Sequence, residues 1–430
     1  MTTADNTDSD PDSATTAEAA PSGTAPSGTF AALAIPRFRL LWTSGAIAFL
    51  AVGMQMTARA WLAIELTDSN SAYAVVILAF GVGMLFSIPF GGVAADRFAK
   101  RTVVVCAHMG LTVSSLWLGA MALAGLEAYW MLVVVSAMHG VSFAFMGPAR
   151  VAFTGEIVPR AVLPNAVSLT QLTVAATQIV GPSLAGFLIA APGMGTAGVY
   201  LITGGLTLVS IVPVLRLPAG RSTRTDHRSP LAELGDGLRY VRADRELAIV
   251  VGSTVFLVLV AMPYATFLPK VAEELFDVGP GWIGVLYGAN SVGGAIATLY
   301  TARVSSADRV RQLRILCGYT MASGIALLAV TPNALVALPV LVFLGGGALA
   351  FQALNSSTAL MLSEPAYHGR IQSLIMVAFS GSSLASTPLG ALADAIGLRQ
   401  MHLFMAVAAG VVVTAAMVLE RSGGRQQALT

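Results

Sequence analysis

Four charged residues interrupt two apolar runs near the first quarter of the chain, in the stretch FGGVAADRFAKRTVVV. Asp96, Arg97, Lys100 and Arg101 fall within six positions, although Asp, Glu, Lys and Arg together make up only 11% of the 430 residues. Bases at the end of an apolar run mark a turn that faces water. This explains the three bases, but not the carboxylate of Asp96 or the glycine four residues before it.

Three more ionisable residues, Arg59, His108 and His139, lie inside apolar runs, and Gln55 precedes Arg59 by one helical turn. Ionisable groups at membrane depth are costly and mark candidate functional sites. Arg59 either binds an anionic group of a cargo molecule or extends to the nearby membrane surface, about 6 Å of helix away. His139 either takes up protons near neutral pH or packs between helices.

Polar but uncharged side chains in the runs are further candidates for contact with a cargo or a proton pathway: Gln171, Gln178, Asn290, Gln352, Asn355, Ser380 and Ser383. The alternative for each is a hydrogen bond that joins two helices. No Asp or Glu falls at the centre of an apolar run; Glu65, Glu364 and Asp394 lie near run ends.

The composition excludes most soluble classes of protein. An ordinary soluble domain is about 25% charged, whereas this chain is 11% charged and 56% hydrophobic, with a mean hydropathy of +0.76. So few charges could not cover the surface of a soluble globule. No basic cluster is interleaved with aromatic residues, so we expect no nucleic-acid partner. Cys106 and Cys317 are two lone cysteines and predict neither a disulfide framework nor a metal site.

A membrane helix needs about 20 mostly apolar residues, and such runs recur from Arg39 onward. They lie at roughly 40–63, 72–95, 102–124, 128–150, 164–191, 196–215, 247–269, 280–302, 313–331, 334–361, 371–396 and 401–419. The backbone of each run must be hydrogen-bonded internally, so each is predicted to be a helix. The sequence therefore predicts an all-α membrane protein with twelve transmembrane helices in two six-helix bundles.

Lys and Arg collect on the cytoplasmic side of a membrane protein. If the N-terminus lies inside, 21 of the 24 Lys and Arg residues fall on that side, Lys270 and Arg399 fall outside, and Arg59 lies within a span. This asymmetry predicts a multi-pass protein of the cell membrane with both termini in the cytoplasm.

The predicted domain organisation has five parts. Residues 1–36 form a disordered acidic tail, since the first 28 residues hold five acids and no base. Residues 37–217 and 247–420 form the two bundles, and residues 421–430 form a second tail. In the linker at 218–246, apolar residues share one helical face at Leu231, Leu234, Leu238 and Val241. This predicts an amphipathic helix on the cytoplasmic membrane surface.

The charged turn resembles the signature of the major facilitator superfamily, G-x-x-x-D-R-x-x-K/R-K/R, placed between the second and third of twelve spans. Its matching residues are Gly92, Asp96, Arg97, Lys100 and Arg101, with Ala99 where the family usually has glycine. The resemblance implies that Gly92 allows close approach to the eleventh span and that Asp96 faces the N-terminus of that helix, where its dipole favours a carboxylate. It implies a latch that breaks as the halves rock, and Arg150 is the candidate charge partner.

The fifth span carries GPSLAG, with Gly181, Pro182 and Gly186, which resembles a motif that the family associates with export. Small residues let helices pack closely in lipid, and proline bends a helix. The stretches WLAIELTDSNSAYAVV, FMGPARVAF and VPRAVLPNAVSL resemble the drug:proton antiporter-3 branch, which includes macrolide-efflux and siderophore-export proteins. The arginine that many proton-coupled relatives carry in the fourth span is replaced by Ser136.

The two halves of the sequence resemble one another at an offset of 206 positions. This shift places Pro159 on Pro365, Pro182 on Pro388, Gly140 on Gly346 and Phe145 on Phe351. Such parallel repeats are typical of transporters whose substrate site lies between the repeats at mid-membrane.

We therefore expect a secondary transporter, working as a monomer, that exports a bulky, partly apolar small molecule in exchange for protons. The chain has no G-x-x-x-x-G-K-S/T loop, so a gradient and not ATP would supply the energy, and we expect no cofactor or metal. Uptake of a small metabolite and a non-transporting membrane sensor are the alternatives. An intramembrane enzyme is disfavoured, because no paired carboxylates or nucleophile motif fall in the spans.

Overall fold

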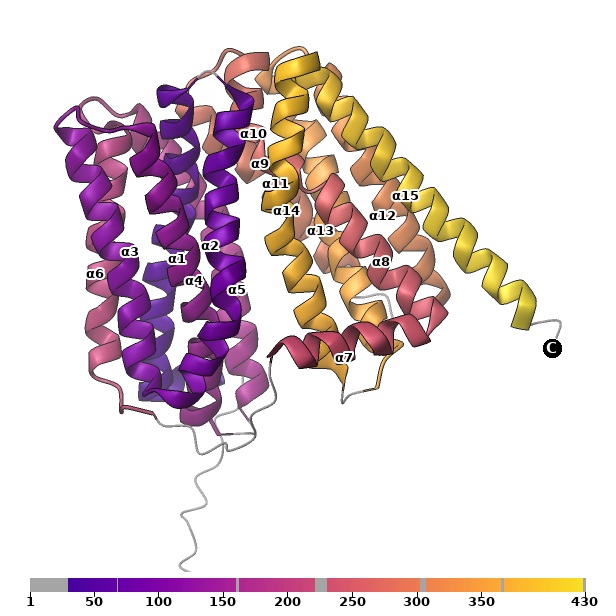
Figure 1. Ribbon diagram of the computed structural model, residues 1–430, viewed down its shortest axis with the longest axis horizontal. Helices are drawn as coiled ribbons and strands as arrows, with labels where there is room; N and C mark the ends of the chain where they lie inside the picture. The colour runs from indigo at the N-terminus through magenta and orange to yellow at the C-terminus, as the bar shows by residue number, and fades with distance from the viewer. Residues whose placement is uncertain are drawn as a thin grey trace, which may run out of the picture.

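The computed structural model describes residues 30–67, 69–159, 162–220, 230–301, 307–364 and 367–427, and every regular element within them is helical. The helices form two halves that stand side by side (Figure 1). The N-terminal half contains η1 (Ala31–Ala34), α1 (Pro36–Leu66), α2 (Asn70–Arg97), α3 (Lys100–Leu123), α4 (Tyr129–Ile157), α5 (Leu163–Ala190) and α6 (Gly195–Leu215). The linker helix is α7 (Pro230–Ala243). The C-terminal half contains α8 (Arg245–Val260), α9 (Pro263–Thr266), α10 (Leu268–Lys270), η2 (Val271–Leu275), α11 (Pro280–Thr301), α12 (Ala307–Val330), α13 (Ala334–Met361), α14 (His368–Ile396) and α15 (Leu398–Gln427).

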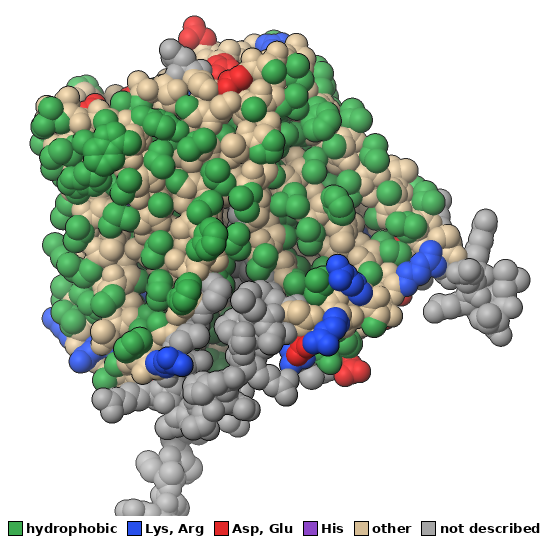
Figure 2. Space-filling model, viewed as in Figure 1, with side chains coloured by type: hydrophobic (Ala, Val, Ile, Leu, Met, Phe, Trp, Pro, Cys, Tyr) green, Lys and Arg blue, Asp and Glu red, His purple; other side chains and the backbone are tan. Residues whose placement is uncertain are grey.

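Eleven helical segments of the described residues are long and apolar enough to cross a membrane. The predicted span that is not among them is the eleventh, at 371–396, which corresponds to α14, a helix of 29 residues. Figure 2 shows a broad hydrophobic surface, with Lys and Arg gathered at the end of the molecule near α7. This distribution suits a protein that lipid surrounds along its middle.

The seventh predicted span is not one continuous helix. The run at 247–269 begins as α8, breaks after Val260, and continues through α9, α10 and η2 to Leu275. Pro263 is the first residue of α9 and Pro269 the second of α10, and proline cannot donate the backbone hydrogen bond that continues a helix. Lys270, in this broken region, is buried and lies 3.1 Å from Glu273 and 3.3 Å from Glu274.

The two halves repeat the same packing. Helices α2 and α4, α3 and α6, and α1 and α5 pack together in the N-terminal half, and the matching pairs α11 and α13, α12 and α15, and α8 and α14 pack together in the other. Helix α2 also packs against α14 across the halves, and its counterpart α11 packs against α5. This arrangement agrees with the internal repeat in the sequence, and Pro182 and Pro388 both lie inside the matching helices α5 and α14.

Within the N-terminal half, α1 and α5 approach through glycines. A Cβ atom placed on Gly181 would lie 2.9 Å from the Cα of Gly53, and one placed on Gly53 would lie 2.8 Å from the carbonyl oxygen of Thr177. Lipid supplies no hydrophobic force between helices, so such backbone approach is a main source of packing energy.

A carboxylate joins the halves at the end of the molecule opposite α7, which we name the far end; the end at α7 is the linker end. Asp394, in the last turn of α14, accepts hydrogen bonds from the backbone N–H of Asn70 at 2.8 Å and of Ser71 at 3.0 Å. The hydroxyl groups of Ser69 and Ser71 also donate to it. The backbone donors belong to the free N-terminus of α2, so charge and helix dipole act together.

Small residues join the second pair of helices across the halves. The hydroxyl of Ser183 on α5 donates to the carbonyl oxygen of Gly284 on α11 at 3.0 Å. A Cβ atom on Gly186 would lie 2.7 Å from the carbonyl oxygen of Pro280, so the glycine permits this approach. Gly186, predicted as part of the motif in the fifth span, is therefore an interface residue between the halves.

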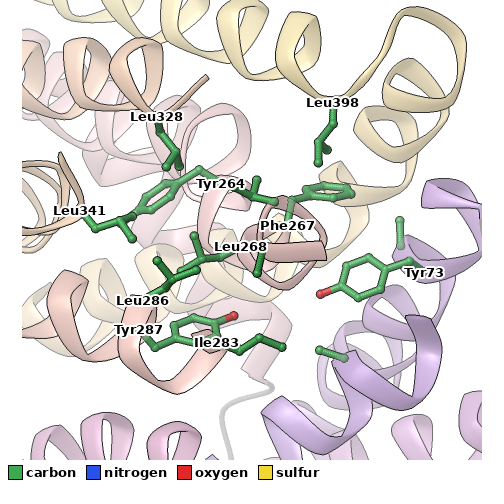
Figure 3. Close-up of a cluster of buried hydrophobic side chains, with 14 of the residues drawn as sticks. Tyr73, Tyr264, Phe267, Leu268, Ile283, Leu286, Tyr287, Leu328, Leu341 and Leu398 are labelled. Atoms are coloured by element: carbon green, nitrogen blue, oxygen red, sulfur yellow. The ribbon is translucent and has the colours of Figure 1, made fainter. Parts of the chain in front are cut away.

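An aromatic contact also joins the halves at the far end. We name this set of contacts the far-end seal: Asp394 binds α2, Ser183 and Gly186 meet α11, and Tyr73 reaches the C-terminal half. The hydroxyl of Tyr73 on α2 donates to the carbonyl oxygen of Thr266 at 2.5 Å, and its ring lies 5.9 Å from that of Phe267. Figure 3 shows Tyr73 pointing from the N-terminal half toward a cluster formed by the C-terminal half. The seal thus lies within the last few turns of the far end.

The linker contains the predicted helix, and this helix packs against the C-terminal half. Figure 1 shows α7 crossing below α14 and α8. Val241 is buried with Leu247 and Ile371, and the ring of Tyr240 stacks on Tyr367 with centroids 3.8 Å apart. The sequence predicted a helix on the membrane surface, and the structure adds that this helix packs against the C-terminal half.

One turn of the predicted disordered tail is folded. Ala31 and Ala32 of η1 are buried, and the backbone N–H of Ala32 donates to Asn165 of α5 at 2.9 Å. The small alanine side chains let this turn pack closely, which an overall count of acids does not reveal. Residues 1–29 lie outside the described part.

Substitution of Gly181 by alanine should destabilise the N-terminal half. The added methyl group would lie 2.9 Å from the Gly53 backbone, and overpacking costs about 1–3 kcal/mol. We expect a lower melting temperature in detergent for G181A. G205A in α6 is the matched control, since a Cβ there meets nothing within 4 Å. Equal melting temperatures for the two variants would contradict this account of the α1–α5 contact.

Substitution of Asp394 by asparagine should open the far end. The amide lacks the charge and turns two donors toward the N–H groups of α2, and hydrogen bonds to charged groups contribute about 1.5–3 kcal/mol each. The ratio of closed to open molecules should fall at least tenfold, which is about 1.4 kcal/mol. In a chain without Cys106 and Cys317, spin labels at the exposed residues Leu126 and Arg399 would measure the separation of the halves.

A second, longer distance should appear in D394N and stay absent in D277N, which removes an exposed far-end acid outside the seal. Asp277 has a φ of 51°, a conformation that asparagine also adopts. Identical distance distributions for D394N and the parent protein would show that the carboxylate does not hold the seal.

Candidate functional site

The charged turn between α2 and α3 binds the segment that follows α6. The backbone N–H groups of Lys100 and Arg101 donate to Gly220 at 2.9 Å and Ala219 at 3.2 Å. The Lys100 ammonium group is buried and forms an ion pair with Glu156 at the end of α4. The bases of the predicted latch therefore tie the linker end of the N-terminal half together, whereas Arg97 is exposed.

The turn does not need the glycine that the family pattern has at position 99. Ala99 has a φ of −58° and a ψ of 122°, which any residue can adopt. Alanine in place of the family's glycine therefore does not prevent the chain from forming this turn.

Arg150, the candidate partner of Asp96, reaches α1. Its Nη2 atom donates to the carbonyl oxygen of Leu41 at 2.9 Å, and its guanidinium group lies 5.5 Å from the ring centroid of Phe49. Gly45 makes room for it, because a side chain there would overlap the guanidinium group. The side chain of Asp96 and the surroundings of Gly92 lie outside the described part, so their pairing stays a prediction.

Three of the predicted pathway residues come together at the middle of the N-terminal half. The Nε2 atom of Gln55 on α1 donates to the hydroxyl of Ser115 on α3 at 2.7 Å. The same hydroxyl lies 3.2 Å from the Nε2 atom of His139 on α4, and Arg59 lies within electrostatic range of His139. Spacing along the sequence linked Gln55 to Arg59, but tertiary packing adds His139 and Ser115.

Arg59 is buried and has no carboxylate partner among the described residues. It is 7% exposed, and its guanidinium carbon lies 4.5 Å from the ring centroid of Phe80 on α2. Its Nε and Nη1 atoms have no hydrogen-bond partner within the described part of the chain. The side chain thus lies against an aromatic ring instead of reaching the membrane surface.

The surroundings of Arg59 do not offset the cost of burying its charge. The effective penalty for a buried ion is several kcal/mol, and a cation–π contact returns about 0.5–2 kcal/mol. A charge that is retained at a net cost inside a membrane is a candidate binding group. This is the strongest single signal of a site in the described structure.

The remaining predicted pathway residues are dispersed. Asn290 accepts a hydrogen bond from the hydroxyl of Tyr264 at 2.8 Å, within the C-terminal half. Asn355 is buried beside Arg314, 3.4 Å from Nη1, and Arg314 pairs with Glu420. Gln178 is exposed on α5, whereas Gln352 and Ser383 are half-buried. The side chains of Gln171 and Ser380 lie outside the described part.

Sequence reasoning missed the residues that act between the halves. Asp394 was placed near the end of a span, but no local pattern indicates that it meets α2. Tyr73 lies near the start of α2 and Tyr287 in the second turn of α11, but they are 214 positions apart, so the repeat offset of 206 does not pair them. Arg314 was counted only among the bases on the cytoplasmic side, and nothing in its spacing of more than one hundred residues from Glu420 predicts a buried ion pair.

Comparison with known proteins places the whole membrane part of the chain in one family. The family model of the transmembrane secretion effectors matches residues 27–425. The enterobactin exporters EntS of Shigella boydii serotype 18 and of Escherichia coli O1:K1 are each 26% identical over 363 residues, which is 83% of this chain and 85% of each exporter.

Solved structures share the fold at low sequence identity. The nucleoside transporter NupG superimposes with a TM-score of 0.70 at 15% identity, covering 89% of this chain and 98% of that one. A bacterial homologue of the human lysosomal transporter Spinster, in an inward-facing and unoccupied conformation, superimposes with a TM-score of 0.72 at 12% identity, covering 90% and 96%. The predicted resemblance and the twelve-helix architecture are thereby confirmed. The chain belongs to the transmembrane secretion effector family and is a multi-pass membrane protein with the major facilitator superfamily fold.

Proposed function

We propose that this protein is a secondary exporter of the cell membrane that moves a bulky, partly apolar small molecule outward by alternating access, as a monomer, in exchange for protons. The family match and the similarity to enterobactin exporters support the outward direction. The observation that carries the mechanism is the far-end seal, because the hydrogen bonds that the described residues form between the halves lie at this one end of the molecule.

The distribution of arginine and lysine supports the orientation. The linker end carries Lys100, Arg101, Arg150 and the basic residues of α7. Because bases accumulate on the cytoplasmic side, the linker end and both termini are proposed to lie in the cytoplasm. The described conformation then faces inward, with its outer side closed by the far-end seal.

The polar contacts of the seal can be exchanged for contacts with water. Asp394 and the N-terminus of α2 both regain water when they separate, whereas the apolar cluster beside them, which includes Ile189 and Ile283, would part at the same time. Two rigid halves that exchange such contacts at one end for contacts at the other can alternate access to a site between them. The charged turn with Asp96 is the proposed latch of the opposite, outward-facing state.

His139 is the candidate proton carrier. Its ring connects through Ser115 to Gln55 and lies near Arg59, so a change at the cargo site would change its proton affinity. Proteoliposomes with an imposed pH gradient and a panel of labelled drugs and siderophores test the function directly. Transport that requires ATP, or transport directed only into the cell, would contradict it.

Substitution of Asp96 by asparagine should slow turnover at least fivefold while the protein stays folded, because the latch of the alternate state loses its charge. Initial rates of cargo movement in the proteoliposome assay measure this, with melting temperature as the check on folding. E364Q is the control, since Glu364 is an exposed acid at the same end. Unchanged turnover in D96N would make Asp96 only a charged turn residue.

A further inference from the structure

The groups around Arg59 come from both halves. Phe80 and Tyr73 lie on α2, and Tyr287 lies on α11 across the interface. The hydroxyl groups of Tyr73 and Tyr287 already donate to the carbonyl oxygens of Thr266 and Ala265, at 2.5 and 2.8 Å. The bond of Tyr73 crosses between the halves and is part of the far-end seal, whereas the bond of Tyr287 lies within the C-terminal half. Opening the seal would therefore move Tyr287 away from Tyr73 and Arg59.

The unused hydrogen-bonding groups near Arg59 can all donate. Nε and Nη1 of Arg59 lack partners, as does the hydroxyl of Tyr200 on α6, which lies within electrostatic range of the guanidinium group. A guanidinium group has no acceptor atoms, and its planar fork matches the two oxygens of a carboxylate or a similar oxyanion. The unpaired hydrogen-bond donors of this site thus fit a ligand with a negatively charged oxygen.

The walls beside these donors are aromatic or apolar. The ring of Phe80 lies under the guanidinium group and 6.2 Å from the ring of Phe143. Met56, three residues before Arg59 and on the same face of α1, is 41% exposed. The face of α1 next to the charge is therefore open on the side toward the linker end.

We propose that Arg59 is the cargo-binding group for organic oxyanions, molecules that join an aromatic or apolar body to a carboxylate, phenolate or similar group. The proposal rests on the exporter function and names its substrate class. The cargo reaches Arg59 from the linker end along the Met56 face, its oxyanion accepts hydrogen bonds from the guanidinium group of Arg59, and its body lies against Phe80 and Phe143. Parting of Tyr73 from the C-terminal half then exposes the bound anion at the far end.

Ligand binding by the purified full chain tests the site without requiring transport. The probes are 1-naphthoate and its uncharged counterpart 1-naphthamide, with affinities measured by titration in detergent. Wild-type protein should bind naphthoate at least tenfold more tightly than naphthamide. R59Q should lose at least tenfold in naphthoate affinity and stay within twofold for naphthamide, and R59K should fall between wild type and R59Q because it keeps the charge without the fork.

R399Q is the matched control, since it removes one exposed arginine of the far end that lies outside the proposed site. It should bind both probes as wild type does. The melting temperature of ligand-free R59Q should equal or exceed that of wild type, because an unpaired buried charge is removed. Equal loss of both probes in R59Q, a lower melting temperature of ligand-free R59Q, or no preference of wild type for naphthoate would each overturn the proposal.

Transport separates this inference from the exporter function. Gradient-driven transport that is the same in wild type and R59Q for charged and uncharged members of the panel would remove the oxyanion site and leave the function standing. Arg59-dependent binding of naphthoate without gradient-driven transport of any compound would leave the site standing and remove the function.

Discussion

In a bilayer, helices gain nothing from burying apolar surface against one another, because lipid is as apolar as the side chains it replaces. Contact between helices then depends on close backbone approach and on polar groups that find partners. This protein uses close backbone approach within one half, and both close approach and polar pairing between the halves. Inside the N-terminal half, Gly53 and Gly181 bring α1 and α5 together. Between the halves, Gly186 and Ser183 meet α11, and Asp394 binds the N-terminus of α2. The first kind of contact makes a rigid half, and the second joins two halves by contacts that water can replace.

Much of this architecture could be predicted because the bilayer restricts the choices. Long apolar runs must be helical, and the offset of 206 pairs two glycines that face equivalent helices: a Cβ atom on Gly140 would meet the backbone of Phe80 on α2, and one on Gly346 would lie 3.3 Å from the carbonyl oxygen of Gly293 on α11. The break of the seventh span at Pro263 was missed, although the sequence contains the signal. Hydropathy averages over a window, and a single missing backbone donor does not change the average.

The site was harder to predict because its parts meet only through tertiary packing. Gln55 and Arg59 share a face of one helix, which a spacing of four residues reveals. Their link to His139 passes through Ser115 on a third helix, and Ser115 has no distinctive neighbours in the sequence. Asp394 has the same difficulty, since its partners Asn70 and Ser71 are more than 300 residues away. A lone polar residue in a membrane span indicates that a partner exists, but it does not indicate which helix provides it.

The unpaired charge of Arg59 and the lack of a central carboxylate in the predicted spans can be understood as one feature. A carboxylate beside Arg59 would satisfy the guanidinium group and remove its affinity for an external anion, so a site for an anionic cargo requires the counter-charge to be left out. The cargo then provides its own driving force. One negative charge that leaves a cell with an inside-negative potential gains about 2.3 kcal/mol per 100 mV, and a proton that enters in exchange adds an equal electrical contribution. Transport of this kind needs no acidic residue in the spans to couple it to the potential, because the cargo itself carries the charge that the potential moves.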